Sequence, residues 1–149
     1  MIAQFRLKTQ LAELARLAAE TSRLGAAHHL QEEIIAHLNL VLEEAVSNII
    51  RHGYGGREDG EVSLAIRFAP EAIAVTVEDQ GMPFNPLGLP DPDLTAPLEE
   101  REVGGMGVYL VRKLTDELDY RSEGGRNILR MVMRIAPGRP KMGAAGADA

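Results

Sequence analysis

A carboxylate and a carboxamide lie four residues apart in the stretch LVLEEAVSNIIRHGYGG, residues 40–56. Helical spacing places Glu44 and Asn48 one turn apart, beside an apolar stripe that has to be buried. A carboxylate there can deprotonate a nucleophile, and an amide oxygen can ligate Mg²⁺, which prefers oxygen donors. Glu43 lies five residues from Asn48 and projects differently, so Glu44 is the predicted base. The structural alternative is a solvated polar face, which also includes His37 and Arg51.

A second carboxylate, Asp79, follows an apolar alternation in the stretch VEDQGMPFNP. Gly81 and Pro83 predict a sharp turn directly after it. A carboxylate at the end of a buried strand can accept a hydrogen bond from an exocyclic amine such as that of adenine, and Gly81 would let the backbone approach a flat ring. An ordinary exit from strand to loop is the structural alternative.

The third stretch, VGGMGVYLVRKL, places Gly104, Gly105 and Gly107 at the start of a predicted helix. Free backbone N–H groups and the positive end of the helix dipole suit a phosphate. No Gly-Lys-Ser/Thr follows, and no strand precedes the glycines, so neither a P-loop nor a dinucleotide fingerprint is present. A flexible hinge with close packing of the helix start is the structural alternative.

Taken in order, the three motifs resemble those of the Bergerat-fold (GHKL) ATPases. Within that superfamily, EEAVSNIIRHGY, DQGMPFNP and GGMGVYLVRKLTDELDY are most similar to the bacterial anti-sigma factor serine/threonine kinases, which carry a histidine-kinase-like ATPase domain. The likeness covers about residues 11–135. It implies an α+β fold, a two-layer α/β sandwich with a mixed, mostly antiparallel sheet and helices on one face.

The resemblance also implies roles for matching residues. Glu44 matches the catalytic base that activates the hydroxyl of a protein substrate, and Asn48 matches the Mg²⁺ ligand that bridges the ion to the ATP phosphates. Asp79 matches the carboxylate that binds adenine, with Gly81 beside the base. ATP and Mg²⁺ are therefore the expected cofactors.

Further roles concern the segment over the nucleotide. Gly105 and Gly107 match glycines that hold this lid and approach the phosphates, and Arg101 is the candidate for a stabilising cation. Many superfamily members carry a threonine near adenine on the last strand, where this chain has Asn127 in GGRNIL. Asparagine, like threonine, can form a hydrogen bond with a nucleotide.

The function implied is that of a serine/threonine protein kinase that acts as an anti-sigma regulatory factor. By family resemblance it would phosphorylate an antagonist protein of the STAS type, bind a sigma factor, and form a homodimer through its N-terminal strand and helix. The alternative is an ATP-dependent switch that sequesters a partner without transferring phosphate. An intact Glu44 disfavours that alternative, because a pure binder needs no base.

Sequence periodicity predicts the elements that position these residues. The predicted elements are a strand in IAQFRLK, a helix over Gln10–Leu24 ended by Gly25, a helix over Leu30–His52 closed by Gly53, strands in EVSLAIRF and AIAVTVED, an irregular segment over 81–104, a helix over Gly107–Leu118, and a strand in NILRMVMRI. Residues 1–136 are expected to form one ATPase domain, and 137–149 a flexible tail.

Composition limits the function classes. The formal charge of −6 and the scarcity of aromatic residues disfavour nucleic acid as a partner. No apolar run is long enough to cross a bilayer, and no secretion signal is present, so a cytoplasmic protein without a membrane partner is expected. The absence of cysteine excludes disulfides and thiolate metal sites.

Overall fold

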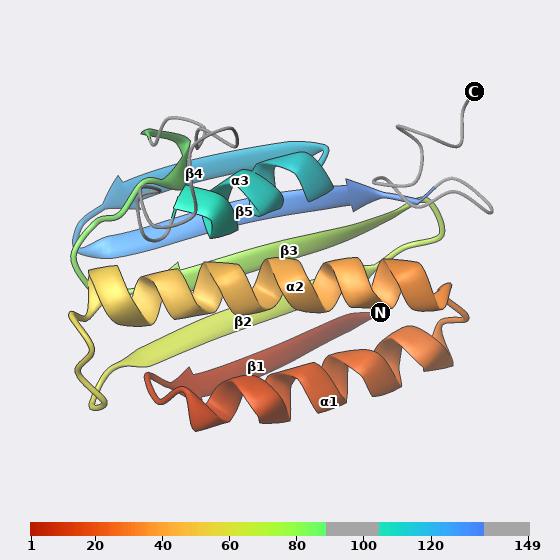
Figure 1. Cartoon of the computed structure of the whole chain (residues 1–149), viewed down its shortest axis with the longest axis horizontal. Helices are drawn as coiled ribbons and strands as arrows, with labels where there is room; N and C mark the ends of the chain where they lie inside the picture. Colours follow the sequence, from red (N-terminus) through yellow and green to blue (C-terminus); the bar gives the residue numbers. More distant parts are fainter. Residues whose placement is uncertain (89–104, 136–149) are drawn as a thin grey trace, which may run out of the picture.

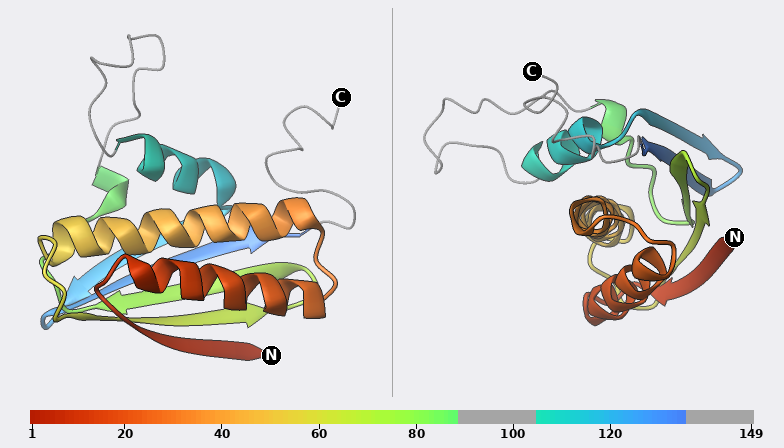
Figure 2. Two further views of the ribbon diagram at one scale, coloured as in Figure 1. Left: turned by 60° about the horizontal axis from the view of Figure 1, so that its bottom comes forward. Right: turned by 90° about the vertical axis from the view of Figure 1, so that its right-hand side faces the viewer.

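The computed structural model describes residues 1–88 and 105–135 of the chain. These residues form a two-layer sandwich of one five-stranded sheet, in the order β1-β2-β3-β5-β4, and one layer of helices (Figure 1). All strand pairings are antiparallel, and the helices cover one face of the sheet (Figure 2). The predicted fold class is confirmed.

The elements are β1 Ile2–Lys8, α1 Ala12–Ala27, α2 Glu32–Asn48, a π-helical turn Ile49–Gly53, β2 Glu61–Phe68, β3 Ala72–Asp79, a 3₁₀ turn Pro86–Gly88, α3 Gly105–Leu114, β4 Glu117–Glu123 and β5 Arg126–Arg134.

The core lies between the sheet and the helices. Alternate side chains of the central strands point toward the helices and are at most 3% exposed in β2 and β3: Val62, Leu64, Ile66, Ile73, Val75 and Val77. The apolar stripe of α2 packs against them, with Ile34, Leu38, Val41 and Leu42 buried. The strand period of two and the helical period of 3.6 therefore select the buried faces, as the sequence predicted.

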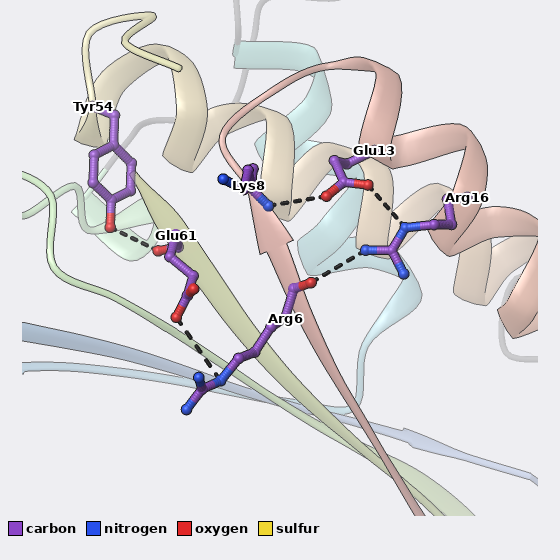
Figure 3. Close-up of polar contacts among 6 residues, drawn as sticks. All are labelled: Arg6, Lys8, Glu13, Arg16, Tyr54 and Glu61. Carbon is purple, nitrogen blue, oxygen red and sulfur yellow. Dashed lines mark hydrogen bonds and ion pairs between the residues drawn. The ribbon is translucent and has the colours of Figure 1, made fainter. Parts of the chain in front are cut away.

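The first helix is fastened to the edge strand β1 by polar contacts (Figure 3). The Glu13 carboxylate accepts hydrogen bonds from the backbone N–H of Lys8 at 3.2 Å and from Nε of Arg16 at 2.8 Å. The Arg16 guanidinium in turn donates to the backbone carbonyl of Arg6 at 3.2 Å. The turn between β1 and α1 is therefore fixed by two side chains of α1 that bind backbone groups of β1.

Gly25 does not end the first helix, contrary to the sequence prediction. Helix α1 continues to Ala27, and Gly25 is buried inside it. A Cβ atom at Gly25 would lie 2.7 Å from Cγ1 of Ile35, so the absence of a side chain allows α1 and α2 to approach closely. The glycine serves helix–helix packing, and the reversal of the chain falls at His29, whose φ is 58°.

The third helix is shorter than predicted, and the strand that follows it was missed. Helix α3 ends at Leu114, where the Thr115 hydroxyl donates to the carbonyl of Val111 at 2.7 Å. Strand β4 is an edge strand with mostly exposed, charged side chains, so its sequence lacks the apolar alternation that identified the other strands. It joins β5 through Gly124 and Gly125, whose φ angles of 59° and 79° suit a tight hairpin.

The second helix changes its geometry at its C-terminal end. Residues Ile49–Gly53 form a π-helical turn that continues α2, with the N–H of Tyr54 donating to the carbonyl of Ile49. Such turns widen the helix locally and are frequent at functional sites. None of the helices within residues 1–88 and 105–135 is long and apolar enough to span a membrane.

Candidate active site

A pocket opens between α2, α3 and the strands β3, β4 and β5. Its walls are mostly apolar, and its lining residues are Ala45, Asn48, Ile49, Gly53, Asp79, Met82, Phe84, Pro86, Val108, Val111, Tyr120 and Leu129. The polar side chains among them are Asn48, Asp79 and Tyr120. An apolar slot with a few polar groups is typical of a binding site for a flat organic ligand.

Asp79 ends β3 on the inward face of the sheet and is 7% exposed. Its Oδ1 accepts a hydrogen bond from the backbone N–H of Gly81 and another from Nδ2 of Asn127, both at 2.8 Å. Burial raises the pKa of the Asp79 carboxyl above its ordinary value of 3.8, and these two hydrogen bonds oppose the rise. Within the described part of the chain, Oδ2 accepts no hydrogen bond, so Asp79 retains an acceptor for a ligand.

Gly81 makes a close backbone contact with the end of the second helix. A Cβ atom at Gly81 would lie 2.6 Å from both the carbonyl carbon and the carbonyl oxygen of Gly53. The N–H of Met82 donates to the same carbonyl at 2.7 Å. Glycine at this position is therefore required for the close contact between the turn after β3 and the π-helical turn. Gly81 does not line the pocket itself, but this contact positions Gly53 and Met82, which do.

Tyr54 holds the opposite side of the same turn. Its hydroxyl donates to the backbone carbonyl of Glu61 at 2.8 Å (Figure 3). The same hydroxyl accepts a hydrogen bond from the N–H of Gln80 at 3.0 Å. A side chain at Gly60 would collide with the Tyr54 ring at 2.5 Å. The residue after Asp79 is thus fixed by a contact that no local sequence motif indicated.

Asn48 faces the pocket from α2 and is 5% exposed. Its side-chain amide makes no hydrogen bond with any described residue. A buried amide without partners costs stability unless a ligand or water satisfies it. Its oxygen donor, its position on the pocket wall and its lack of protein partners fit a ligand of Mg²⁺.

Glu44 lies one helical turn before Asn48 but faces a different space. It is half-buried and lines a surface groove between α1 and α2, whereas Asn48 lines the pocket. A Cβ atom at Gly107 would lie 2.0 Å from Oε2 of Glu44, so the start of α3 packs directly on this carboxylate. Among the described residues, no side chain hydrogen-bonds or pairs with the Glu44 carboxylate.

The remaining predicted site residues are placed as follows. Gly105 begins α3, while Arg101 and Gly104 lie outside the described residues. His37 is mostly buried, and its Nδ1 has no hydrogen-bond partner among the described residues, while Arg51 is exposed in the π-helical turn that follows α2. The polar stripe that the sequence suggested is therefore divided among the pocket, the groove and solvent.

Gly107→Ala is expected to displace the Glu44 carboxylate. Alanine in a helix is intrinsically favourable by about 0.5–1 kcal/mol relative to glycine, but here its methyl group would occupy the position of Oε2. We therefore expect no gain in the free energy of unfolding from Gly107→Ala alone, and a gain of roughly that size in a Glu44→Ala background. A double-mutant cycle by chemical denaturation measures this coupling. Equal effects in both backgrounds would show that the carboxylate does not lie against Gly107.

Comparison with known proteins places the chain in a family. The family described as histidine kinase-like ATPase domain matches residues 7–133. The chain belongs to this family. The match includes the pocket, the groove and all the candidate residues of the α2 and β3 motifs, so the resemblance seen in the sequence is confirmed.

Curated relatives narrow the family further. The chain is 28% identical over 128 residues to the serine-protein kinase RsbW of Listeria monocytogenes, covering 81% of this chain and 79% of that protein. It is 31% identical over 131 residues to the anti-sigma F factor of Clostridium novyi, covering 88% of this chain and 90% of that one. The predicted enzyme class, a serine/threonine protein kinase, is thus the class named for relatives of this ATPase domain.

A solved structure shows the same fold. The RsbU and RsbW domains of a Mycobacterium tuberculosis protein match with a TM-score of 0.65 at 17% sequence identity. The match covers 90% of this chain and 32% of that longer one. At this identity the likeness concerns the arrangement of helices and strands, which agrees with the two-layer sandwich described above.

Proposed function

We propose that the protein is an ATP- and Mg²⁺-dependent serine/threonine protein kinase and anti-sigma regulatory factor, which phosphorylates an antagonist protein of the STAS type. The observation that carries the proposal is the arrangement on α2. Asn48 faces an apolar pocket, and one turn away Glu44 faces an open groove; neither the Asn48 amide nor the Glu44 carboxylate has a partner among residues 1–88 and 105–135. This geometry supports a nucleotide on one side and a protein hydroxyl on the other.

The pocket suits ATP. Oδ2 of Asp79 would accept a hydrogen bond from the adenine amine, and the apolar walls, including Val108 and Leu129, would contact the ring faces. The start of α3 would direct backbone N–H groups toward the phosphates. Asn48 would hold the Mg²⁺ ion, which neutralises charge on the phosphates when bound.

Glu44 would act as the base. Phosphoryl transfer to a hydroxyl depends mainly on positioning and charge stabilisation, with a carboxylate accepting the proton of the attacking hydroxyl. The Glu44 carboxylate is not engaged by any other described side chain, so it is available for this proton. Arg101, in the segment outside the described residues, remains the proposed cation for the transferred phosphoryl group.

The groove between α1 and α2 supports a protein substrate. It is lined by leucine and alanine side chains and ends at polar residues that include Glu44; the lining residues are Leu11, Leu14, Ala15, Leu17, Ala18, Ala36, Asn39, Leu40, Leu42, Glu43, Glu44, Ser47 and Arg51. A segment of the antagonist bound along this groove would bring its serine or threonine to the base. We also propose that the chain binds a sigma factor, forms a homodimer through β1 and α1, and acts in the cytoplasm.

Leu11→Asp tests the groove. Leu11 is 59% exposed and directly precedes the first residue of α1, where a negative charge interacts favourably with the helix dipole. We expect the variant to be as stable as the wild type but to need about tenfold more antagonist for half-maximal phosphorylation, since losing an apolar contact and adding a charge costs roughly 1–2 kcal/mol. Ala19→Asp, on an exposed position of the same helix outside the groove, is the matched control. An unchanged requirement for antagonist in Leu11→Asp would remove the groove from the docking surface.

The central experiment incubates the protein with γ-labelled ATP, Mg²⁺ and a STAS-type protein encoded beside it. Transfer of the label to a serine or threonine of that partner is the expected result. ATP binding without transfer to any such partner would instead support the alternative, a switch that sequesters a protein without phosphorylating it.

A further inference from the structure

Asn127 lies at the centre of a buried hydrogen-bond network beside the pocket. It is 2% exposed and stands directly opposite Asp79 in the pairing of β3 with β5, and opposite Ser122 in the pairing of β4 with β5. Its Nδ2 donates to Oδ1 of Asp79 and to the carbonyl oxygen of Gly81, both at 2.8 Å. Its Oδ1 accepts from the Ser122 hydroxyl at 2.7 Å and from the Tyr120 hydroxyl at 3.3 Å.

These contacts fix the orientation of the Asn127 amide and use it completely. The carbonyl oxygen of Gly81 can only accept, so the nitrogen of the amide has to face it. A primary amide has two N–H donors and two acceptor lone pairs, and here all of them are engaged. Asn127 therefore has no hydrogen-bonding capacity left for a nucleotide, which answers the question that its place in the sequence raised.

The Asn127 side chain instead holds the Asp79 carboxylate in place through a hydrogen bond. Asn127 and the Gly81 N–H together occupy Oδ1, and Oδ2 accepts no hydrogen bond from the residues that the structure describes. We propose that Asn127 is a positioning residue that makes the site select purines with a 6-amino group over those with a 6-oxo group, by holding Asp79 as a carboxylate with Oδ2 free. This inference rests on the proposed function, because it concerns the same nucleotide pocket.

The selectivity follows from hydrogen-bond polarity. A carboxylate oxygen accepts from the 6-amino group of adenine but repels a 6-oxo group, whereas a protonated carboxyl can donate to that oxo group. Nδ2 of Asn127 stabilises the charged form of a carboxyl that burial otherwise disfavours. Loss of this donor would let Asp79 take up a proton more readily and so weaken the preference for adenine.

Among the described side chains near Asp79, Asn127 is the one that donates a hydrogen bond to its carboxylate. The neighbouring Glu78 points to the other face of the sheet and pairs with Arg126. His52 of the π-helical turn stacks on Phe84 with ring centroids 4.6 Å apart. The tyrosine hydroxyls reach Asp79 only indirectly, Tyr120 through Asn127 and Tyr54 through the N–H of Gln80. Burial, Asn127 and Gly81 are the causes of the shifted pKa of Asp79, and no charged side chain is among them.

The test measures binding of ATP and of inosine triphosphate, which carries an oxo group at position 6, at pH values from about 5.5 to 9. For Asn127→Ala we expect ATP affinity to fall as the pH falls, and the preference for ATP over inosine triphosphate to drop about tenfold or more at the acidic end, the usual effect of losing one charge-assisted hydrogen bond. For the isosteric Asn127→Asp we expect the opposite trend. There a proton shared by the facing carboxyls keeps a donor to Asp79 at low pH, and ionisation removes it as the pH rises.

Ser122→Ala is the matched control, because it removes a hydrogen bond to Asn127 while leaving both donors to Asp79 in place. It should retain the wild-type preference at every pH. A merely structural role of Asn127 would weaken both nucleotides equally and independently of pH, and that result in either variant would overturn the proposal. If the wild type binds neither nucleotide, the proposed function fails as well; if it prefers ATP and the variants keep that preference, this inference alone fails.

Discussion

Glu44→Gln is expected to lower the rate constant of phosphoryl transfer by about 10²–10⁴-fold, the usual contribution of a general base, while ATP still binds. Glutamine has the same shape but cannot accept a proton at neutral pH. Glu44 does not line the nucleotide pocket, so its loss should leave the affinity for ATP within about twofold, which is less than the effect of one hydrogen bond. Single-turnover transfer to the antagonist and calorimetric titration of ATP measure the two quantities separately.

Glu43→Gln is the matched control for this experiment. Glu43 is the adjacent carboxylate on the same helix and is exposed, whereas Glu44 lies half-buried against Gly107. Because Glu43 also lines the groove, the two variants are compared at saturating antagonist, where the control should transfer phosphate with a rate constant close to that of the wild type. If Glu43→Gln abolished transfer and Glu44→Gln did not, the assignment of the base from helical spacing would be wrong.

The sequence was most informative where one face of an element is buried. The strands EVSLAIRF and AIAVTVED were located without error, because alternation with a period of two is imposed by the core. Strand β4 was missed because an edge strand with charged side chains has no such constraint. The helix end predicted at Gly25 is wrong, because a glycine that ends a helix and a glycine that lets two helices touch look identical in a single sequence.

The site was predictable as a set of residues but not as an arrangement. Spacing placed Glu44 and Asn48 one turn apart, yet only the packing of α1 and α3 against α2 shows that one faces the groove and the other the pocket. The contact of Gly81 with Gly53 depends on a π-helical turn that no sequence pattern announces. Asn127 and Asp79 are opposite each other because of the strand register, which is set by the whole sheet.

Asp79→Asn is expected to separate ligand binding from stability. Asparagine keeps an oxygen that can accept from Gly81 and Asn127, but it would turn its amide nitrogen toward the adenine amine, so two donors would face each other. We expect the affinity for ATP to fall by about 1–3 kcal/mol, or roughly 5- to 150-fold. Calorimetric titration measures this loss, and Glu78→Gln, on the opposite face of the same strand, is the control. An unchanged affinity would exclude Asp79 from the adenine site.

The same substitution should not destabilise the nucleotide-free protein at neutral pH. The pKa of Asp79 in the folded protein is raised above the ordinary value of 3.8, so folding disfavours the ionised carboxyl. Its contribution to stability is therefore fully present below pH 3.8 and is lost as the pH rises through the raised pKa. At pH 7 the wild type contains a buried charge that destabilises the folded state, and Asp79→Asn lacks it. The variant should therefore unfold at an equal or higher denaturant concentration than the wild type. This difference in stability should shrink as the pH falls toward 4. A variant that is clearly less stable than the wild type at pH 7 would mean that the carboxylate, in spite of its burial, holds the turn at Gly81 more strongly than a neutral amide can. In that case the Asp79 carboxylate would stabilise the fold in addition to binding ATP. In the expected case it lowers the stability of the nucleotide-free protein and serves only to bind the ligand.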